Sequence, residues 1–266
     1  TKGQLNELVE EIIRGGARLF VCAVGVPPPS VVERLHAAGI PVMNMVGAVH
    51  HVEKALSVGC DIICAQGGEG GGHTGSCATS ILIPKVADAC RGRRSPLTGE
   101  DVHVVAAGGI FDSRGLAMAL ALGAQAAWVG TRFVACTEAG APPRHKKAVV
   151  AAGYDATHRT LIYTGRPLRI IKNAYSTDWE ENRAQEAREV CARGQLPFEY
   201  DVEKREQEGR PIDGRQYMEA MPLLCGAVAG AIDDVRPARE IVDEMVRGAA
   251  DILQRNAALV VGPSRL

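Results

Sequence analysis

The sequence lacks the features that mark three large classes of protein. Its formal net charge is only −1, so no global field attracts nucleic acid or an anionic membrane. No apolar run approaches the ~20 residues of a membrane helix. The eight cysteines form no Cys-x-x-Cys pair, and a chain of 266 residues is too long to rely on a disulfide framework. We therefore expect a cytoplasmic protein with reduced thiols, no nucleic-acid partner and no membrane span.

The first half of the chain repeats one alternation of segments. A helical pattern is followed by an apolar run and then by small residues, as in Leu5 to Ile13, which Gly15 ends. Runs this apolar are typical of parallel strands that helices cover on both faces, and their alternation with helices predicts βαβ units. Five such strands are predicted, at residues 18–24, 40–46, 61–65, 102–107 and 126–129.

The pattern changes near Ala141. Charged residues with isolated aromatics dominate the next seventy or so positions, which predicts a smaller, mostly helical second domain. An apolar stretch at 223–232 and an amphipathic helix at 238–253 then restore a packed layer. We expect three parts: a (β/α) barrel portion at 1–140, a helical domain at 141–222, and C-terminal helices at 223–266 that pack back on the barrel. Because the chain begins with Thr1 rather than Met, we also expect a longer N-terminus. Whether that part contains a targeting segment is left open.

A glycine run follows the third predicted strand. Five of the seven residues from Gly67 to His73 are glycine, which lets a backbone approach a ligand and turn its amides toward an anion. Loops after buried strands are where α/β proteins place ligands. The alternative is a flexible surface loop. The G-x-G-x-x-G at Gly70, Gly72 and Gly75 is not read as a dinucleotide fingerprint, because Pro84 interrupts the following segment and a loop occupies the region near residue 95.

The next two predicted strands end in similar glycine-containing motifs. Residues 106–110 read Ala-Ala-Gly-Gly-Ile and lead to a helix whose predicted N-cap is Asp112 or Ser113. Residues 128–133 read Trp-Val-Gly-Thr-Arg-Phe. In a (β/α)8 barrel counted from its end, these are strands 7 and 8, whose loops commonly form a phosphate site. Gly108 and Gly109 would present backbone amides there, and Thr131 a hydroxyl and an amide.

His73 stands at the rim of the glycine run. A histidine with an ordinary pKa near 6.5 can remove a proton from carbon at neutral pH, which favours His73 as a general base. No second His, Cys or carboxylate stands at ligand spacing around it, so we expect no metal site.

Three segments together resemble a known family. Residues 65–75, 106–110 and 130–133 are similar to those of the nitronate monooxygenases, formerly called 2-nitropropane dioxygenases, and the resemblance extends over most of the chain. It implies an α/β fold of the TIM (β/α)8 type that holds FMN at the barrel mouth. The family's barrel starts with three strands upstream of those seen here, so the chain would supply five strands of eight.

The resemblance also implies roles for individual residues. Gln66 would contact the isoalloxazine, Gly71 and Gly109 would lie along the ribityl phosphate, and residues 128–131 would grip the phosphate. His73 would be the base that takes the α-proton of a nitroalkane or assists oxidation of its nitronate. The expected cofactor-binding set is Gln66, Gly71, Gly72, Gly108, Gly109, Trp128, Val129, Gly130 and Thr131.

The implied reaction converts a nitronate or nitroalkane and O2 to a carbonyl compound and nitrite. FMN would carry the redox chemistry while the protein supplies orientation and the base. Two alternatives stay open: an FMN-dependent NAD(P)H reductase of the same barrel group, of the enoyl-(acyl carrier protein) or quinone reductase type, and an inactive truncated product. One departure concerns Ala227, which stands where many relatives carry a glutamine that makes a polar contact near the active site.

Overall fold

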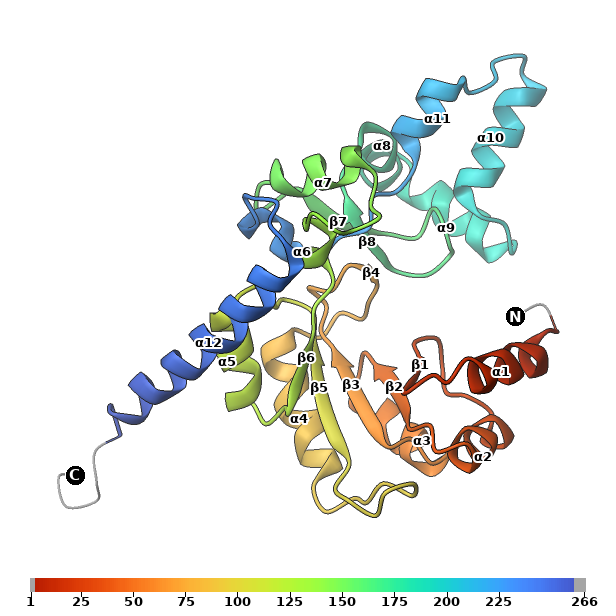
Figure 1. Ribbon diagram of the computed structural model, residues 1–266. Coiled ribbons are helices and arrows are strands. Elements are labelled where there is room, and N and C mark those ends of the chain that lie inside the picture. Colours follow the sequence, from red (N-terminus) through yellow and green to blue (C-terminus); the bar gives the residue numbers. More distant parts are fainter. Residues whose placement is uncertain (1–2, 261–266) are drawn as a thin grey trace. The chain divides into compact units, whose positions relative to one another are not determined.

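A computed structural model describes residues 3–260 (Figure 1). The outermost residues of the first and third predicted domains, 1–2 and 261–266, lie outside the described residues. The chain forms two compact units. The described part of unit 1 comprises residues 3–68, 75–128 and 245–260, and unit 2 comprises residues 69–74 and 129–244. The domain boundaries expected from the sequence stay predictions.

Unit 1 is built on a parallel five-stranded sheet. Its strand order is β1-β2-β3-β5-β6, and every neighbouring pair is parallel. All five strands predicted from apolar runs are confirmed, and the α/β class with them. Their bounds are β1 Phe20–Cys22, β2 Val42–Val46, β3 Ile62–Gln66, β5 His103–Ala107 and β6 Ala126–Trp128.

Helices alternate with these strands along the chain. The expected N-cap of α5 is Asp112, whose carboxylate accepts hydrogen bonds from the backbone N–H groups of Arg114 and Gly115. On the helix-covered face of the sheet, Val42, Ile63 and Ala65 are completely buried. The helices are α1 Leu5–Arg14, α2 Pro29–Ala37, α3 His51–Ser57, α4 Thr79–Cys90, α5 Ser113–Ala121 and, from Met245 onward, α12 Ala238–Ala257.

Pro84 does not interrupt the segment after the glycine run, so that expectation is wrong. It lies inside α4, which continues to Cys90. A proline removes one intrahelical hydrogen bond, but α4 buries Leu82, Ile83 and Val86 completely, and this apolar face holds the helix together. The case against a dinucleotide fingerprint therefore rests on the loop near residue 95.

Unit 2 contains a sheet that the sequence did not predict. Strand β4 (Gly72–His73) pairs antiparallel with β8 (Leu168–Ile171), and β8 pairs antiparallel with β7 (Thr157–Thr160). Helices account for most of the remaining regular structure of unit 2. They are α6 Thr131–Val134, α7 Pro143–Val150, α8 Ala174–Asn182, α9 Ala184–Ala192, α10 Pro197–Gln207, α11 Gly214–Ala220, the 3-10 helix η1 Ala227–Ala231 and the first residues of α12.

The core of unit 2 is centred on one aromatic residue. Trp179 of α8 is completely buried beside Ile162 and Ala187. The Arg183 guanidinium carbon lies 3.5 Å from the centroid of the Trp179 ring, a cation–π contact that attaches the α8–α9 junction to this core.

The cysteines are free thiols, as the sequence predicted. Burial raises the pKa of the Cys60, Cys64 and Cys225 thiols to about 12, so these groups stay protonated at neutral pH. Among residues 3–260, no helix combines the length and the apolar character needed to cross a membrane.

Candidate functional site

The residues expected to bind FMN are divided between the two units. In unit 1 they are Gln66, Gly108, Gly109 and Trp128. In unit 2 they are Gly71, Gly72, Val129, Gly130 and Thr131, together with His73 as the expected base. No group of three His, Cys, Asp or Glu side chains able to hold a metal ion occurs between residues 3 and 260.

Unit 1 brings its members of this set to one edge of the sheet. Gln66 is in register with Ala107, and Ala107 is in register with Trp128, so three neighbouring strands end at the same level. The Gly67 N–H donates to the Ala107 carbonyl over 2.9 Å and extends the ladder by one step. Gln66, Gly108 and Trp128 therefore lie along the carboxyl edge of a parallel sheet, the usual position of a ligand in α/β proteins.

Two consecutive glycines shape the loop after β5. Gly108 and Gly109 have φ values of +84° and +74°, in the left-handed region that other residues rarely adopt. The Gly108 carbonyl accepts a hydrogen bond of 3.0 Å from the Thr79 hydroxyl at the start of α4. The carboxylate of Asp112 fixes the other end of the loop where α5 begins. The backbone conformation of this turn is therefore set before any ligand arrives.

The glycine run is not one uniform ligand-facing loop. A Cβ on Gly67 would lie 2.0 Å from the Thr79 hydroxyl oxygen and 2.6 Å from the Thr79 Cα. A Cβ on Gly75 would lie 2.8 Å from the Gly47 carbonyl oxygen. Both positions need glycine because other parts of unit 1 pack directly against their backbone.

In unit 2 the same run packs against a distant segment. A Cβ on Gly71 would lie 2.6 Å from the Cys225 carbonyl carbon, and a Cβ on Gly226 would lie 2.5 Å from the Glu69 carbonyl oxygen. The Ala227 N–H donates to that same Glu69 carbonyl over 2.9 Å. Ala227 therefore lies against the glycine run and contributes a backbone N–H donor there, in place of the glutamine side chain of many relatives. Gly72, at φ +71°, follows in strand β4.

Thr131 is the buried first residue of α6. Its Oγ1 accepts a 2.8 Å hydrogen bond from the backbone N–H of Gly226. Because the hydroxyl accepts in this contact, its own proton stays free to be donated. Gly130 before it has φ −107°, and a Cβ there would meet no atom within 4 Å. Space for a ligand next to this backbone is therefore present in unit 2.

Arg132 follows Thr131 and was not among the predicted site residues. Its side chain is 4% exposed and pairs with Asp234 over 2.7 Å. The same guanidinium donates to the carbonyls of Ala135 and Asp234, each over 2.8 Å. A buried arginine with these partners fixes the short helix that carries Thr131.

His73 is exposed, and a contact with Thr164 orients its ring. The Nε2 atom lies 3.0 Å from Thr164 Oγ1, and that hydroxyl donates to the Arg166 carbonyl over 3.2 Å. A hydroxyl has one proton, so Nε2 is the donor to Thr164 and Nδ1 keeps the lone pair of the neutral ring. Sequence reasoning missed Thr164, because nothing local links it to a histidine 91 positions away.

The nitronate monooxygenase family model matches residues 3–248. The chain belongs to the nitronate monooxygenase family. The family predicted from the three motifs is thereby confirmed. The match includes the glycine run, both later strand ends and most of unit 2.

Individual relatives agree with this assignment. The chain is 32% identical to a nitronate monooxygenase of Neurospora crassa, over 85% of this chain and 58% of the relative. It is also 32% identical to an octahydroindene-carboxyl-CoA dehydrogenase of Mycobacterium tuberculosis, over 96% of this chain and 78% of the relative. A solved nitroalkane oxidase of Streptomyces ansochromogenes superimposes with a TM-score of 0.71 at 25% identity, covering 95% of this chain and 69% of that one.

The chain is shorter than these relatives. It spans between about half and about three quarters of the length of the curated relatives it matches, with values of 49%, 58%, 62% and 78% among them.

Proposed function

We propose that this nitronate monooxygenase family member uses FMN and O2 to oxidise alkyl nitronates and nitroalkanes to carbonyl compounds and nitrite. The observation that carries the proposal is the alignment of Gln66, Gly108 and Trp128 at one carboxyl edge of the parallel sheet. The family match and the likeness to a nitroalkane oxidase support the choice of substrate.

The residues present fit the phosphate and ring of FMN. The left-handed Gly108–Gly109 turn provides half-buried backbone without side chains of its own, and Thr131 keeps a free hydroxyl proton beside the open position of Gly130. In this proposal Gln66 contacts the isoalloxazine, Gly71, Gly72, Gly108 and Gly109 lie along the ribityl phosphate, and residues 128–131 hold the phosphate. When bound, FMN supplies the two-electron redox chemistry of the reaction.

The proton chemistry falls to His73. Because Nε2 donates to Thr164, Nδ1 is the atom that would accept a proton from the carbon next to a nitro group, which leaves a nitronate. The Thr164 contact orients the ring for this transfer. A nitronate offered directly has already lost that proton, so it needs His73 less.

We also propose that the five-stranded sheet is part of an eight-stranded barrel. It has two open edges, β1 and β6, and its face opposite the helices carries Met43, Cys64 and Ala107 among half-buried apolar neighbours. Three further strands from a preceding segment would join the edges and cover this face. We further propose a domain at 141–222, a C-terminal part at 223–266 and a cytoplasmic location.

One experiment separates the candidate functions. The purified chain is reconstituted with FMN and mixed anaerobically with propionate 3-nitronate or with NADH. We expect the nitronate to bleach the flavin and NADH to leave it oxidised. Bleaching by NADH alone would overturn the proposal in favour of a reductase. A protein that retains no yellow cofactor would instead fit the truncated, inactive product.

The second candidate is an FMN-dependent NAD(P)H reductase that acts on thioesters. The near-complete alignment with a CoA-thioester dehydrogenase, over 96% of this chain, favours it. Oxidation of NADH under anaerobic conditions by an enoyl-CoA, whose conjugated C=C bond takes up the two electrons, without nitronate turnover, would identify this activity.

His73→Asn tests the base. This variant should retain FMN and lose most turnover of neutral nitroalkanes, while pre-formed nitronates are less affected. His103→Asn is the matched control, because His103 is an exposed histidine at the opposite end of strand β5. Unchanged nitroalkane turnover in His73→Asn would remove His73 from this role.

A further inference from the structure

Unit 2 has a cavity, open to solvent on one side, that contains none of the residues assigned to FMN or to proton transfer. Its volume is about 600 Å³, within the range of small-molecule sites. Its walls come from α7, α8, α10 and α11 and from the end of strand β8. The cavity is thus a candidate for a second ligand, separate from the flavin chemistry.

The floor of the cavity is apolar. Ile171, Met221 and Leu223 line it, and each is half-buried. The Ile171 N–H donates to the Leu223 carbonyl over 2.9 Å, so backbone pairing holds two sides of the floor together. This surface suits a hydrocarbon chain.

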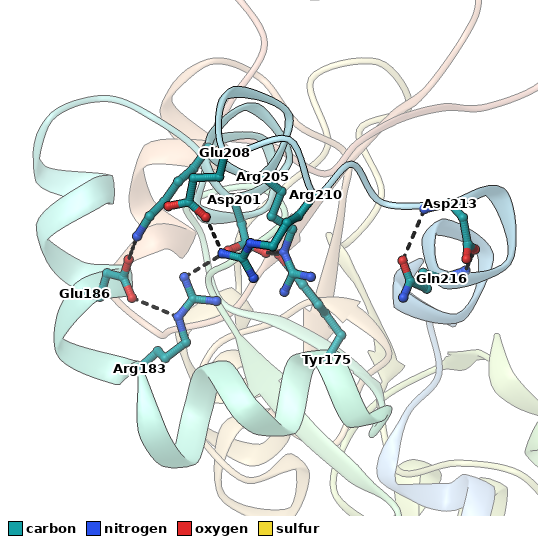
Figure 2. Close-up of polar contacts among 10 residues, drawn as sticks. Tyr175, Arg183, Glu186, Asp201, Arg205, Glu208, Arg210, Asp213 and Gln216 are labelled. Atoms are coloured by element: carbon teal, nitrogen blue, oxygen red, sulfur yellow. Dashed lines mark hydrogen bonds and ion pairs between the residues drawn. The ribbon is translucent and has the colours of Figure 1, made fainter.

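An ion-pair network lies beside the cavity and contributes Tyr175 and Arg205 to its lining (Figure 2). Asp201, whose side chain is 6% exposed, accepts from Arg205 Nε over 2.9 Å and pairs with Arg183 over 3.0 Å. The Tyr175 hydroxyl donates to Asp201 over 3.1 Å, and Glu186 pairs with Arg183 over 2.8 Å. The charge of Arg205 is therefore already matched, although its side chain lines the cavity.

The acidic side chains at the rim also have partners. Asp178 accepts from the Asn182 amide over 2.9 Å, and Glu219 pairs with Arg215 over 2.8 Å. These interactions direct both carboxylates to groups of their own helices. Arg215 balances the charge of Glu219, whereas the Asn182 amide is uncharged and leaves Asp178 with its negative charge.

Two cations at the rim have no matching anion. Arg144 of α7 donates to the uncharged carbonyl of Met218. Lys172, next to β8, forms no ion pair or side-chain hydrogen bond in the described part of the chain. The cavity therefore combines an apolar floor with an excess of positive charge at its mouth, two unpaired cations against the one carboxylate of Asp178.

We propose that this cavity binds an organic carboxylate with an apolar chain, its headgroup at Arg144 and Lys172 and its chain on Ile171, Met221 and Leu223. Guanidinium and ammonium groups form charge-assisted hydrogen bonds with a carboxylate, and a guanidinium can do so through two parallel bonds. The aliphatic chain gains free energy by leaving water for the floor.

Calorimetric titration of the whole chain with decanoate tests the site. We expect one decanoate per chain, with butyrate binding at least ~10-fold more weakly because it covers little of the floor. Arg144→Met and Lys172→Met should each weaken decanoate binding ~5- to 10-fold through loss of one charge-assisted hydrogen bond. Lys147→Met, an exposed lysine of α7 that does not line the cavity, is the matched control and should leave binding unchanged.

A blocking variant locates the ligand. Ala174→Phe places a ring in the cavity from the first turn of α8 and should abolish decanoate binding. Absence of saturable binding, or binding that survives both Ala174→Phe and the Arg144→Met, Lys172→Met double variant, would overturn the proposal. FMN content and nitronate turnover should stay unchanged in all these variants, so this site and the proposed reaction can fail independently.

Discussion

The ring of His73 donates through Nε2 to Thr164, whose hydroxyl lies 3.0 Å away and itself donates a hydrogen bond to the Arg166 carbonyl. This chain of two hydrogen bonds selects one neutral tautomer of the histidine. The basic nitrogen is then Nδ1, and the orientation of the ring depends on a residue in the turn between β7 and β8.

Thr164→Val removes the acceptor for Nε2 and keeps the side-chain shape. We expect kcat for neutral nitroalkanes to fall ~10-fold, less than the roughly 10²- to 10⁴-fold contributed by a positioned base itself, because the base stays and only its orientation is lost. Turnover of pre-formed nitronates should change little, and Thr164→Ser should restore the nitroalkane rate. Equal losses with both substrates would contradict an orienting role for Thr164.

Gly130→Ala separates ligand space from protein packing. A methyl group there meets no protein atom within 4 Å and φ is −107°, so we expect stability of the FMN-free protein to change by less than ~0.5 kcal/mol. FMN affinity should fall, because the methyl group occupies space beside the proposed phosphate. Chemical denaturation without FMN and fluorescence titration with FMN measure the two effects.

Gly71→Ala should behave in the opposite way. The new Cβ would lie 2.6 Å from the Cys225 carbonyl carbon, so backbone must move at a cost of about 1–3 kcal/mol. We expect this loss in the FMN-free protein. A Gly71→Ala variant as stable as the parent chain would show that the segment around Cys225 yields readily.

Thr131→Val leaves the buried Gly226 N–H without its acceptor. The free energy of unfolding should fall by about 1–3 kcal/mol even without FMN, and FMN affinity should fall as well because the donated hydroxyl proton is lost. Thr131→Ser should recover both quantities. Weakened FMN binding with unaltered stability would mean that the Gly226 contact contributes little to the fold.

His158 should make stability depend on pH. Burial lowers its pKa below the usual 6.5, and Nε2 of the ring lies 2.9 Å from the Ser176 hydroxyl. As pH falls below about 6.5, the unfolded chain takes up a proton before the folded one does, so the free energy of unfolding decreases. The decrease ends once pH passes below the lowered pKa of the folded state.

His158→Gln should flatten this pH dependence. Urea unfolding at about pH 7.5 and about pH 5.5 measures it, with the parent chain losing more stability than the variant across that interval. His51 and His145 also have pKa values lowered mainly by burial and should supply the remaining slope. An identical slope in the variant would show that His158 does not contribute.

The parallel sheet of unit 1 could be predicted because each of its strands has a recognisable local sequence pattern. Each is a short apolar run bounded by small residues, and burial on both faces requires little else. Strand β7 contains no such apolar run, and the short run of β8, Leu-Arg-Ile-Ile, is interrupted by a charged residue. Residues 157–160 read Thr-His-Arg-Thr, and their pairing depends on β8 and, through it, on Gly72 and His73 far earlier in the chain.

The glycine run shows a second limit of sequence reasoning. A glycine required by a ligand and a glycine required by neighbouring backbone look alike in sequence. Gly67 and Gly71 contact Thr79 and Cys225, and the second of these partners lies in a segment more than a hundred residues away. Only the positions Gln66, Gly108 and Trp128, fixed by strand order, could be placed on a common edge beforehand.

The burial of the thiols has a practical consequence. Five cysteines are buried, whereas Cys22, Cys77 and Cys191 are partly accessible. Cys22 and Cys77 belong to unit 1 and Cys191 to unit 2. A maleimide spin label or dye would therefore attach to both units at native positions. Cys191→Ser would confine the label to unit 1, and the Cys22→Ser, Cys77→Ser double replacement would confine it to unit 2, so that either unit can be followed alone during flavin loading.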